Sequence, residues 1–185
     1  MSLPQYMSRS DTGLLVIDLQ VKLLGAIAQG ESVVRRTALL VEGSKILGIP
    51  VLATEQYPKG LGPTHPDLIS KLNPPLEKLD FSCAALEGVL SFFEERKLKK
   101  ILLAGIETHV CVLQTALDLL ALGFEVFGAV DAMGSRFAQD HEWGLHRMEK
   151  AGVALTTAEA AIFEWTERAG SPEFKQISQL VKEGR

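Results

Sequence analysis

The sequence predicts an α/β fold: a three-layer α/β/α sandwich on a mostly parallel six-stranded sheet with strand order 3-2-1-4-5-6. Short apolar runs alternate along the chain with segments whose apolar residues recur at helical spacing, which is typical of parallel strands joined by helices. The first run, residues 13–18, is continuously apolar up to a final carboxylate, as expected for a strand buried on both faces. Right-handed crossovers then place helices on both faces of the sheet.

The individual elements follow from this pattern in chain order. We expect strands at residues 13–18, 50–54, 75–79, 100–104, 125–130 and 153–156. We expect helices at residues 31–47, 84–97, 110–122, 139–151 and 172–183, the first of them ended by Gly48. A loop rich in Pro and Gly occupies residues 55–66. With 185 residues and no interdomain linker, the sequence predicts an N-terminal tail, 1–12, followed by a single domain, 13–185.

Composition argues against several function classes. The net charge of −4 comes without acidic or basic blocks, so neither nucleic acid nor an anionic membrane is an expected partner. The basic group Lys97, Lys99 and Lys100 fits the solvated end of a helix. No apolar run approaches the roughly 20 residues of a membrane span, and the first residues lack the apolar core of a secretory signal. Two cysteines without metal-pair spacing fit a reducing compartment, so we expect a cytoplasmic protein.

The expected ligand site lies where the strand order reverses. Open α/β sheets bind ligands beyond the carboxyl ends of their strands at that point, here between strands 1 and 4. Asp18 ends strand 1 and Cys111 follows strand 4, so the two side chains are expected to face one crevice. The chain has no GxGxxG fingerprint after strand 1 and no Walker A loop. The sequence therefore does not support either of the two usual nucleotide sites of such folds, the dinucleotide site or the P-loop site.

Cys111 is the candidate nucleophile. A thiol near a helix N-terminus meets unpaired backbone N–H groups and the positive end of the helix dipole, which favour the thiolate and lower the thiol pKa. The same N–H groups stabilise the oxyanion of a tetrahedral intermediate. The alternative is that Cys111 is a small buried residue chosen for its size. Cys83 opens an apolar helix and is interpreted as a core residue.

Asp18 and Lys78 are candidate partners of the thiol. A partly desolvated Asp18 would accept the thiol proton, although a carboxylate at a strand end also serves as a backbone cap. Lys78 follows the candidate third strand and would hold two anionic groups together, although most lysines are solvated. A Cys–His pair with His109 is the competing scheme, and the four histidines include no HExxH zinc motif.

At these residues the sequence resembles the isochorismatase-like cysteine hydrolases, relatives of the nicotinamidases, from about residue 13 to 163. The pieces that carry the resemblance are LLVIDLQ, TEQYPKGLGPT, EKLDFSC, LAGIETHVCVLQTALDLL and VFGAVDAMGSR, in this order. The resemblance implies a catalytic triad of Asp18 as general base, Lys78, and Cys111 as nucleophile. It also implies a non-proline cis peptide at Ile106–Glu107, which would turn the Glu107 N–H toward the oxyanion beside that of Cys111.

The resemblance also bears on metal and substrate. Family members that cleave the vinyl ether of isochorismate lack the cysteine, so its presence favours covalent acyl chemistry. The nicotinamidase metal site needs an Asp-x-His pair, whereas this loop has Glu55-Gln56-Tyr57, and His65 alone does not complete a site; we expect no metal and no other cofactor. The TEQYPKGLGPT loop looks most like the isochorismatase-domain subgroup, whose substrates family membership does not settle.

The sequence therefore predicts a metal-independent cysteine hydrolase that acts on a small amide or related C–N substrate through a thioester. Motif adjacency suggests a substrate pocket lined by Gln20, Leu23, Tyr57 and His109. A non-catalytic binding or scaffold protein with the same fold is the alternative, and a redox sensor using Cys83 is a third hypothesis. Because the family commonly assembles, we expect a homo-oligomer.

Overall fold

The computed structural model describes residues 6–184 and contains one six-stranded, all-parallel sheet. Its strands are β1 (Thr12–Ile17), β2 (Val51–Gln56), β3 (Leu76–Lys78), β4 (Lys100–Ile106), β5 (Glu125–Gly134) and β6 (Ala154–Thr156). They lie in the order β3-β2-β1-β4-β5-β6. The predicted fold class and strand order are confirmed.

Helices lie between successive strands, and two more follow the last strand. They are α1 (Val21–Leu24), α2 (Gly30–Leu47), α3 (Pro58–Leu61), α4 (Pro66–Ile69), α5 (Glu87–Glu95), α6 (Leu113–Ala121), α7 (Ala138–Ala151), α8 (Ala158–Thr166) and α9 (Phe174–Glu183). A 3-10 turn, η1 (Cys83–Ala85), and a π-helical turn, η2 (Thr108–Val112), complete the chain. The sequence analysis assigned no element to the region of α8, although the Thr157 side chain caps its first turn by accepting from the Ala160 N–H.

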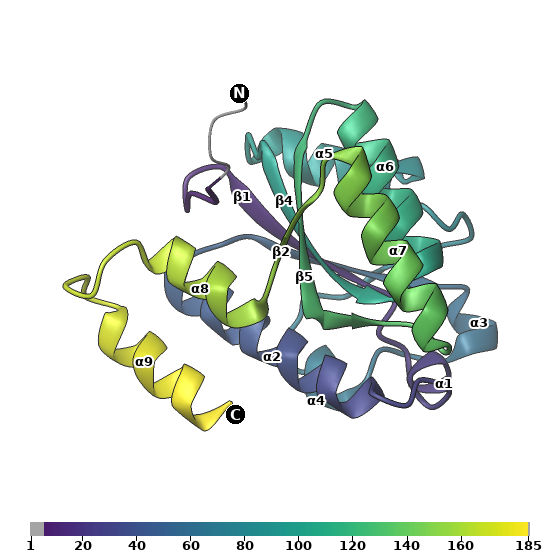
Figure 1. Ribbon diagram of the computed structural model, residues 1–185, viewed down its shortest axis with the longest axis horizontal. Helices are drawn as coiled ribbons and strands as arrows, with labels where there is room; N and C mark the ends of the chain where they lie inside the picture. The colour runs from purple at the N-terminus through teal and green to yellow at the C-terminus, as the bar shows by residue number, and fades with distance from the viewer. Residues whose placement is uncertain (1–5, 185) are drawn as a thin grey trace.

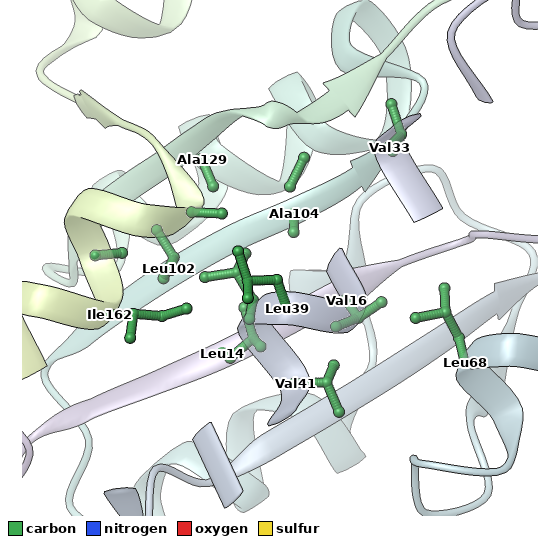
Figure 2. Close-up of a cluster of buried hydrophobic side chains, with 14 of the residues drawn as sticks. Leu14, Val16, Val33, Leu39, Val41, Leu68, Leu102, Ala104, Ala129 and Ile162 are labelled. Carbon is green, nitrogen blue, oxygen red and sulfur yellow. The ribbon is translucent and has the colours of Figure 1, made fainter. Parts of the chain in front are cut away.

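The helices cover both faces of the sheet. Figure 1 shows α2, α8 and α9 on one side and α5, α6 and α7 on the other. Alternate residues of each strand enter two cores: Leu14 and Val16 of β1 pack in the cluster that includes α2 and α8, whereas Leu15 and Ile17 pack in the cluster toward α5 and α6. Figure 2 shows the first of these clusters. This two-sided burial explains why β1 is continuously apolar.

The N-terminal residues pack against the domain. Of the predicted tail, residues 1–5 lie outside the described residues. Met7 is buried and its N–H donates to the Glu164 carboxylate, while Arg9 donates to the Trp165 carbonyl, both on α8. Residues 7–9 are therefore fixed on the helix that the sequence analysis did not find. None of the helices described is long and apolar enough to cross a membrane.

Candidate active site

The carboxyl ends of four neighbouring strands carry the candidate site. Lys78 ends β3, Gln56 ends β2, Asp18 follows β1, and Cys111 lies in the η2 turn that follows β4. Lys78 pairs with Gln56 in the sheet register, and Ile17, just before Asp18, pairs with Thr54. The structure thus brings Asp18, Lys78 and Cys111 together, although Asp18 and Cys111 are 93 positions apart in the sequence.

Asp18 and Lys78 form an ion pair closed to solvent. The Lys78 Nζ lies 2.7 Å from the Asp18 Oδ2, and neither side chain has exposed surface. Nζ also donates to the Gln56 Oε1 at 2.6 Å and to the carbonyls of Phe81 and Asp80 at 3.0 and 3.3 Å. Burial lowers the pKa of Lys78, but the attraction of Asp18 and of the two cysteines outweighs it, so the pKa is raised and the ammonium keeps its charge.

The other carboxylate oxygen has its own donor. The Thr54 hydroxyl donates to the Asp18 Oδ1 at 2.8 Å, so a different side chain holds each oxygen. Asp18 itself has a left-handed backbone with φ of 53°, a conformation that Asp tolerates better than most residues. The chain therefore turns sharply at the end of β1, directly at the carboxylate.

Cys111 lies beside this pair with 6% of its surface exposed. Its Sγ donates to the Gln56 Oε1 at 4.0 Å, and the charge of the nearby Asp18 carboxylate acts on the thiol. Burial raises the pKa of the thiol from 9.0 to about 12, the charge of Asp18 and a hydrogen bond to it add to the rise, and Lys78 opposes it. The expectation that the helix N-terminus lowers the thiol pKa is therefore wrong for the resting protein, because desolvation outweighs the dipole.

Because the Cys111 thiol stays protonated, it needs a base before it can attack an electrophile. Attack on an electrophile requires the proton to leave, and Asp18 is the nearby carboxylate whose charge acts on the thiol. Lys78 balances the charge of the pair whether it resides on Asp18 or on Cys111. The arrangement therefore places a thiol beside a carboxylate that is able to accept its proton.

The turn before Cys111 is hydrogen-bonded to the segment that follows β5. The peptide bond between Ile106 and Glu107 is cis, and the Val112 N–H bonds the Glu107 carbonyl across the π turn. Glu107, Thr108 and His109 each contact the segment 135–141. The contacts are Arg136 N–H and Nε to the Glu107 Oε1 at 3.1 and 3.0 Å, His141 Nδ1 to the Thr108 Oγ1 at 2.9 Å, and Ser135 Oγ to the His109 Nδ1 at 3.0 Å.

The predicted pocket residues have different surroundings. Gln20 is fully buried, and its side chain bonds the backbone of Gln56 and Gly62, so it orders the loop after β2. Leu23 packs against the core on the α2 side. Tyr57 is half exposed and lines an open depression of about 500 Å³ together with Lys78. A smaller cavity of about 100 Å³ lies between residues 27–29 and 133–141.

The partners of His109 and Glu55 bear on whether these residues could serve as a base or bind a metal ion. His109 bonds Ser135, and its Nε2 lies 3.8 Å from the Asp140 carboxylate, so both ring nitrogens face the 135–140 segment. Glu55 accepts from the N–H and hydroxyl of Thr64 at 2.6 and 2.7 Å and thereby closes the loop after β2. Among residues 6–184, His, Cys, Asp and Glu side chains form no group of three that could hold a metal ion.

Two side chains that the sequence did not single out contact the candidate triad, and a third, Cys83, contacts one of these two. Gln56 accepts from Lys78, Thr54 donates to Asp18, and the Cys83 Sγ lies 3.5 Å from the Thr54 hydroxyl. The signal for Gln56 and Thr54 was their place at the carboxyl end of strand 2, beside strand 1. Cys83 carried no such signal, because the 3-10 turn that brings it here is a tertiary feature.

Comparisons with known proteins agree with this fold. The family model described as Isochorismatase domain matches residues 12–160. Isochorismatase domain-containing protein 2A of Mus musculus is 40% identical over 171 residues, which cover 92% of this chain and 82% of that protein. The structure of MAR1 ribonuclease from Caenorhabditis elegans has a TM-score of 0.91 and 36% identity, covering 96% of this chain and 93% of that chain.

A more distant likeness is to YcaC. The Pseudomonas aeruginosa protein, solved with hexane-2,5-diol and covalent acrylamide, is 20% identical with a TM-score of 0.87. The Escherichia coli protein, described as an octameric hydrolase of unknown specificity, is 21% identical with a TM-score of 0.88. Each match covers 99% of this chain and 98% of the other, and at this identity it shows the fold alone. On the evidence of the domain match and the 40% identity, the chain belongs to the isochorismatase family and has the fold of its hydrolases.

Proposed function

We propose that this protein is a cysteine hydrolase that acts on a small amide or a related C–N substrate through a thioester. The observation that carries the proposal is the nearly buried Cys111 thiol at the carboxyl edge of the sheet, which shares the Gln56 Oε1 with Lys78 of the Asp18–Lys78 ion pair. In this proposal the three residues are nucleophile, general base and charge-balancing cation.

The reaction has two halves. Asp18 takes the Cys111 proton as the sulfur attacks the carbonyl carbon, and the backbone N–H groups of Glu107 and Cys111 stabilise the oxyanion. The C–N bond breaks as Asp18 returns the proton to the leaving nitrogen, which leaves a thioester. Water then attacks the thioester and Asp18 takes its proton. The acid leaves, and the proton returns to the sulfur.

The Pseudomonas aeruginosa YcaC structure with covalent acrylamide supports the nucleophile of the proposal, because a protein of this fold there carries a covalent adduct of a small electrophile. By analogy with the octameric YcaC of E. coli we also propose that copies of this chain associate, which sedimentation velocity measures directly. Both cysteines are free, which supports a reducing, cytoplasmic location.

Ribonuclease activity, suggested by the name of the C. elegans neighbour, is the second candidate. The net charge of −4 gives little support to binding a polyanion. Incubation with labelled single-stranded RNA, with the Cys111→Ala variant alongside, discriminates the two. RNA cleavage that depends on Cys111 would replace the amide proposal.

The test of the mechanism is the pH profile of iodoacetamide labelling at Cys111, measured by peptide mass spectrometry between pH 4 and 9 with Cys83 as internal control. If Asp18 removes the proton during attack, the rate rises with pH at the acid end and then reaches a plateau. Asp18→Asn removes the plateau, and its rate rises about tenfold per pH unit, as for a thiol without a base. The same unbroken rise in the wild-type protein would refute the mechanism.

Turnover tests the substrate class. In a screen of small amides, we expect hydrolysis by the wild-type protein and none above background by Cys111→Ala. Hydroxylamine added during turnover traps the thioester as a hydroxamate. Hydrolysis that survives Cys111→Ala contradicts the thioester.

A further inference from the structure

The structure surrounds Asp18 with more polar groups than the three proposed catalytic residues. Thr54 on β2 has 1% of its surface exposed, and Cys83 in η1 is fully buried. The Thr54 hydroxyl contacts the Asp18 Oδ1 at 2.8 Å and the Cys83 Sγ at 3.5 Å. The proposed mechanism uses neither residue.

The direction of these hydrogen bonds follows from chemistry. A hydroxyl has one proton to donate and accepts through its lone pairs, whereas an ionised carboxylate only accepts. Thr54 therefore donates to Asp18, and its oxygen is left to accept from the Cys83 S–H. This needs Cys83 to stay a thiol, and burial followed by the charge of Asp18 raises its pKa to about 11. The chain of donors runs from Cys83 through Thr54 to Asp18.

Cys83 is itself anchored. Its backbone N–H donates to the Thr115 Oγ1 at 2.9 Å, and Thr115 lies fully buried on α6, four residues after Cys111. Helix α6, which follows Cys111, therefore also fixes the backbone of Cys83, whose thiol contacts Thr54. The charged and titratable groups that act on Asp18 from the surrounding elements are Lys78 on β3, Cys83 in η1 and Cys111 in η2.

We infer that Thr54 is a positioning residue. Its hydroxyl accepts from the Cys83 thiol and fixes one oxygen of Asp18, while Lys78 holds the other oxygen. The inference rests on the proposed role of Asp18 as the base. With one partner on each oxygen, rotation of the carboxylate is restricted. The Thr54 hydroxyl also stabilises the charged form of Asp18, which is the form that accepts the thiol proton.

The experiment compares Thr54→Val with Thr54→Ser in the labelling profile of Cys111. Val keeps the shape of Thr and removes the hydroxyl, whereas Ser keeps the hydroxyl. We expect Thr54→Val to move the midpoint of the acid limb upward by about one pH unit, because Asp18 loses a hydrogen bond to its charged form. Thr54→Ser keeps the wild-type midpoint.

Thr37→Val is the matched control, since Thr37 is equally buried, lies on α2, and its hydroxyl has no partner among the described residues. A midpoint that moves in Thr54→Val and in neither other variant supports the inference. If Thr54→Val does not fold, Thr54→Ala removes the same hydroxyl with less bulk. An acid limb that stays in place without the hydroxyl overturns the positioning role and leaves the proposed function standing.

The failure of the proposed function has a different signature: the wild-type protein itself then shows no acid limb. Cys83→Ala and Cys83→Ser test the second contact separately. Ser keeps a donor to Thr54, so we expect an upward shift of the midpoint in Cys83→Ala alone, and smaller than in Thr54→Val. A wild-type midpoint in both variants excludes a role for Cys83.

Discussion

Two ion pairs lie at the carboxyl edge of the sheet, and their surroundings differ sharply. Lys78 and Asp18, between β3 and β1, have no exposed side-chain surface. Arg136 and Glu107, at the ends of β5 and β4, lie 3.0 Å apart, but the arginine side chain is 53% exposed. The first pair includes the proposed base, and the second holds the turn that carries Cys111, the proposed nucleophile.

The difference in exposure indicates which of the two ion pairs contributes more to the stability of the fold. Water screens an exposed pair, so its loss changes stability little. A buried pair is different, because removing one partner leaves the other charge without solvent or counterion. Similar distances in the two regions thus predict unequal consequences.

The largest effect is expected for Lys78→Met. The substitution leaves Asp18 uncompensated, so the free energy of unfolding should fall by about 3–5 kcal/mol. Urea denaturation followed by circular dichroism measures it. The control is the double variant Asp18→Asn/Lys78→Met, which removes both charges and should recover most of the loss. A Lys78→Met variant as stable as the wild-type protein would show that the Asp18–Lys78 pair is not shielded from water.

An intermediate effect is expected in alkali. The Cys111 pKa is raised to about 12 and that of Cys83 to about 11, so the folded chain keeps protons that the unfolded chain releases near pH 9. The raised pKa of Lys78 acts in the same direction. Unfolding therefore releases protons, and its free energy should fall above pH 9 by up to about 1.4 kcal/mol per pH unit for each thiol.

Denaturation midpoints between pH 8 and 11 measure this decline, with Cys111→Ala for comparison. We expect a shallower decline in the variant, because one of the buried thiols is gone. Parallel curves for the two proteins would mean that Cys111 is more accessible to water than the 6% exposure indicates.

The smallest effect on stability is expected for Arg136→Gln. The midpoint of urea denaturation should stay within experimental error of the wild-type value, with or without added salt, because the guanidinium is already solvated. The labelling plateau of Cys111 is a more sensitive measurement, since Arg136 contacts Glu107 in the turn before the nucleophile. A loss of stability comparable to that of Lys78→Met would remove the contrast between the two regions.

The sequence was sufficient to predict the sheet because the apolar pattern of each strand lies within a few consecutive residues. Continuous apolar runs such as residues 13–17 indicate strands buried on both faces, and the structure confirms the sheet and its order. It was insufficient for α8, where no periodic pattern had been recognised. The carboxyl-end rule brought out Asp18 and Cys111 because it needs only the strand order.

The sequence by itself determined the residue types and the strand ends on which they lie: Asp18 after β1, Lys78 at the end of β3 and Cys111 after β4. Only the tertiary structure decided how strongly they interact. Thr54 and Cys83 join Asp18 because β2 and η1 pack against β1, and the thiol pKa rises because several elements together exclude water from Cys111. Helix position is a local property and burial a collective one, so the dipole argument made from the sequence gave the wrong direction.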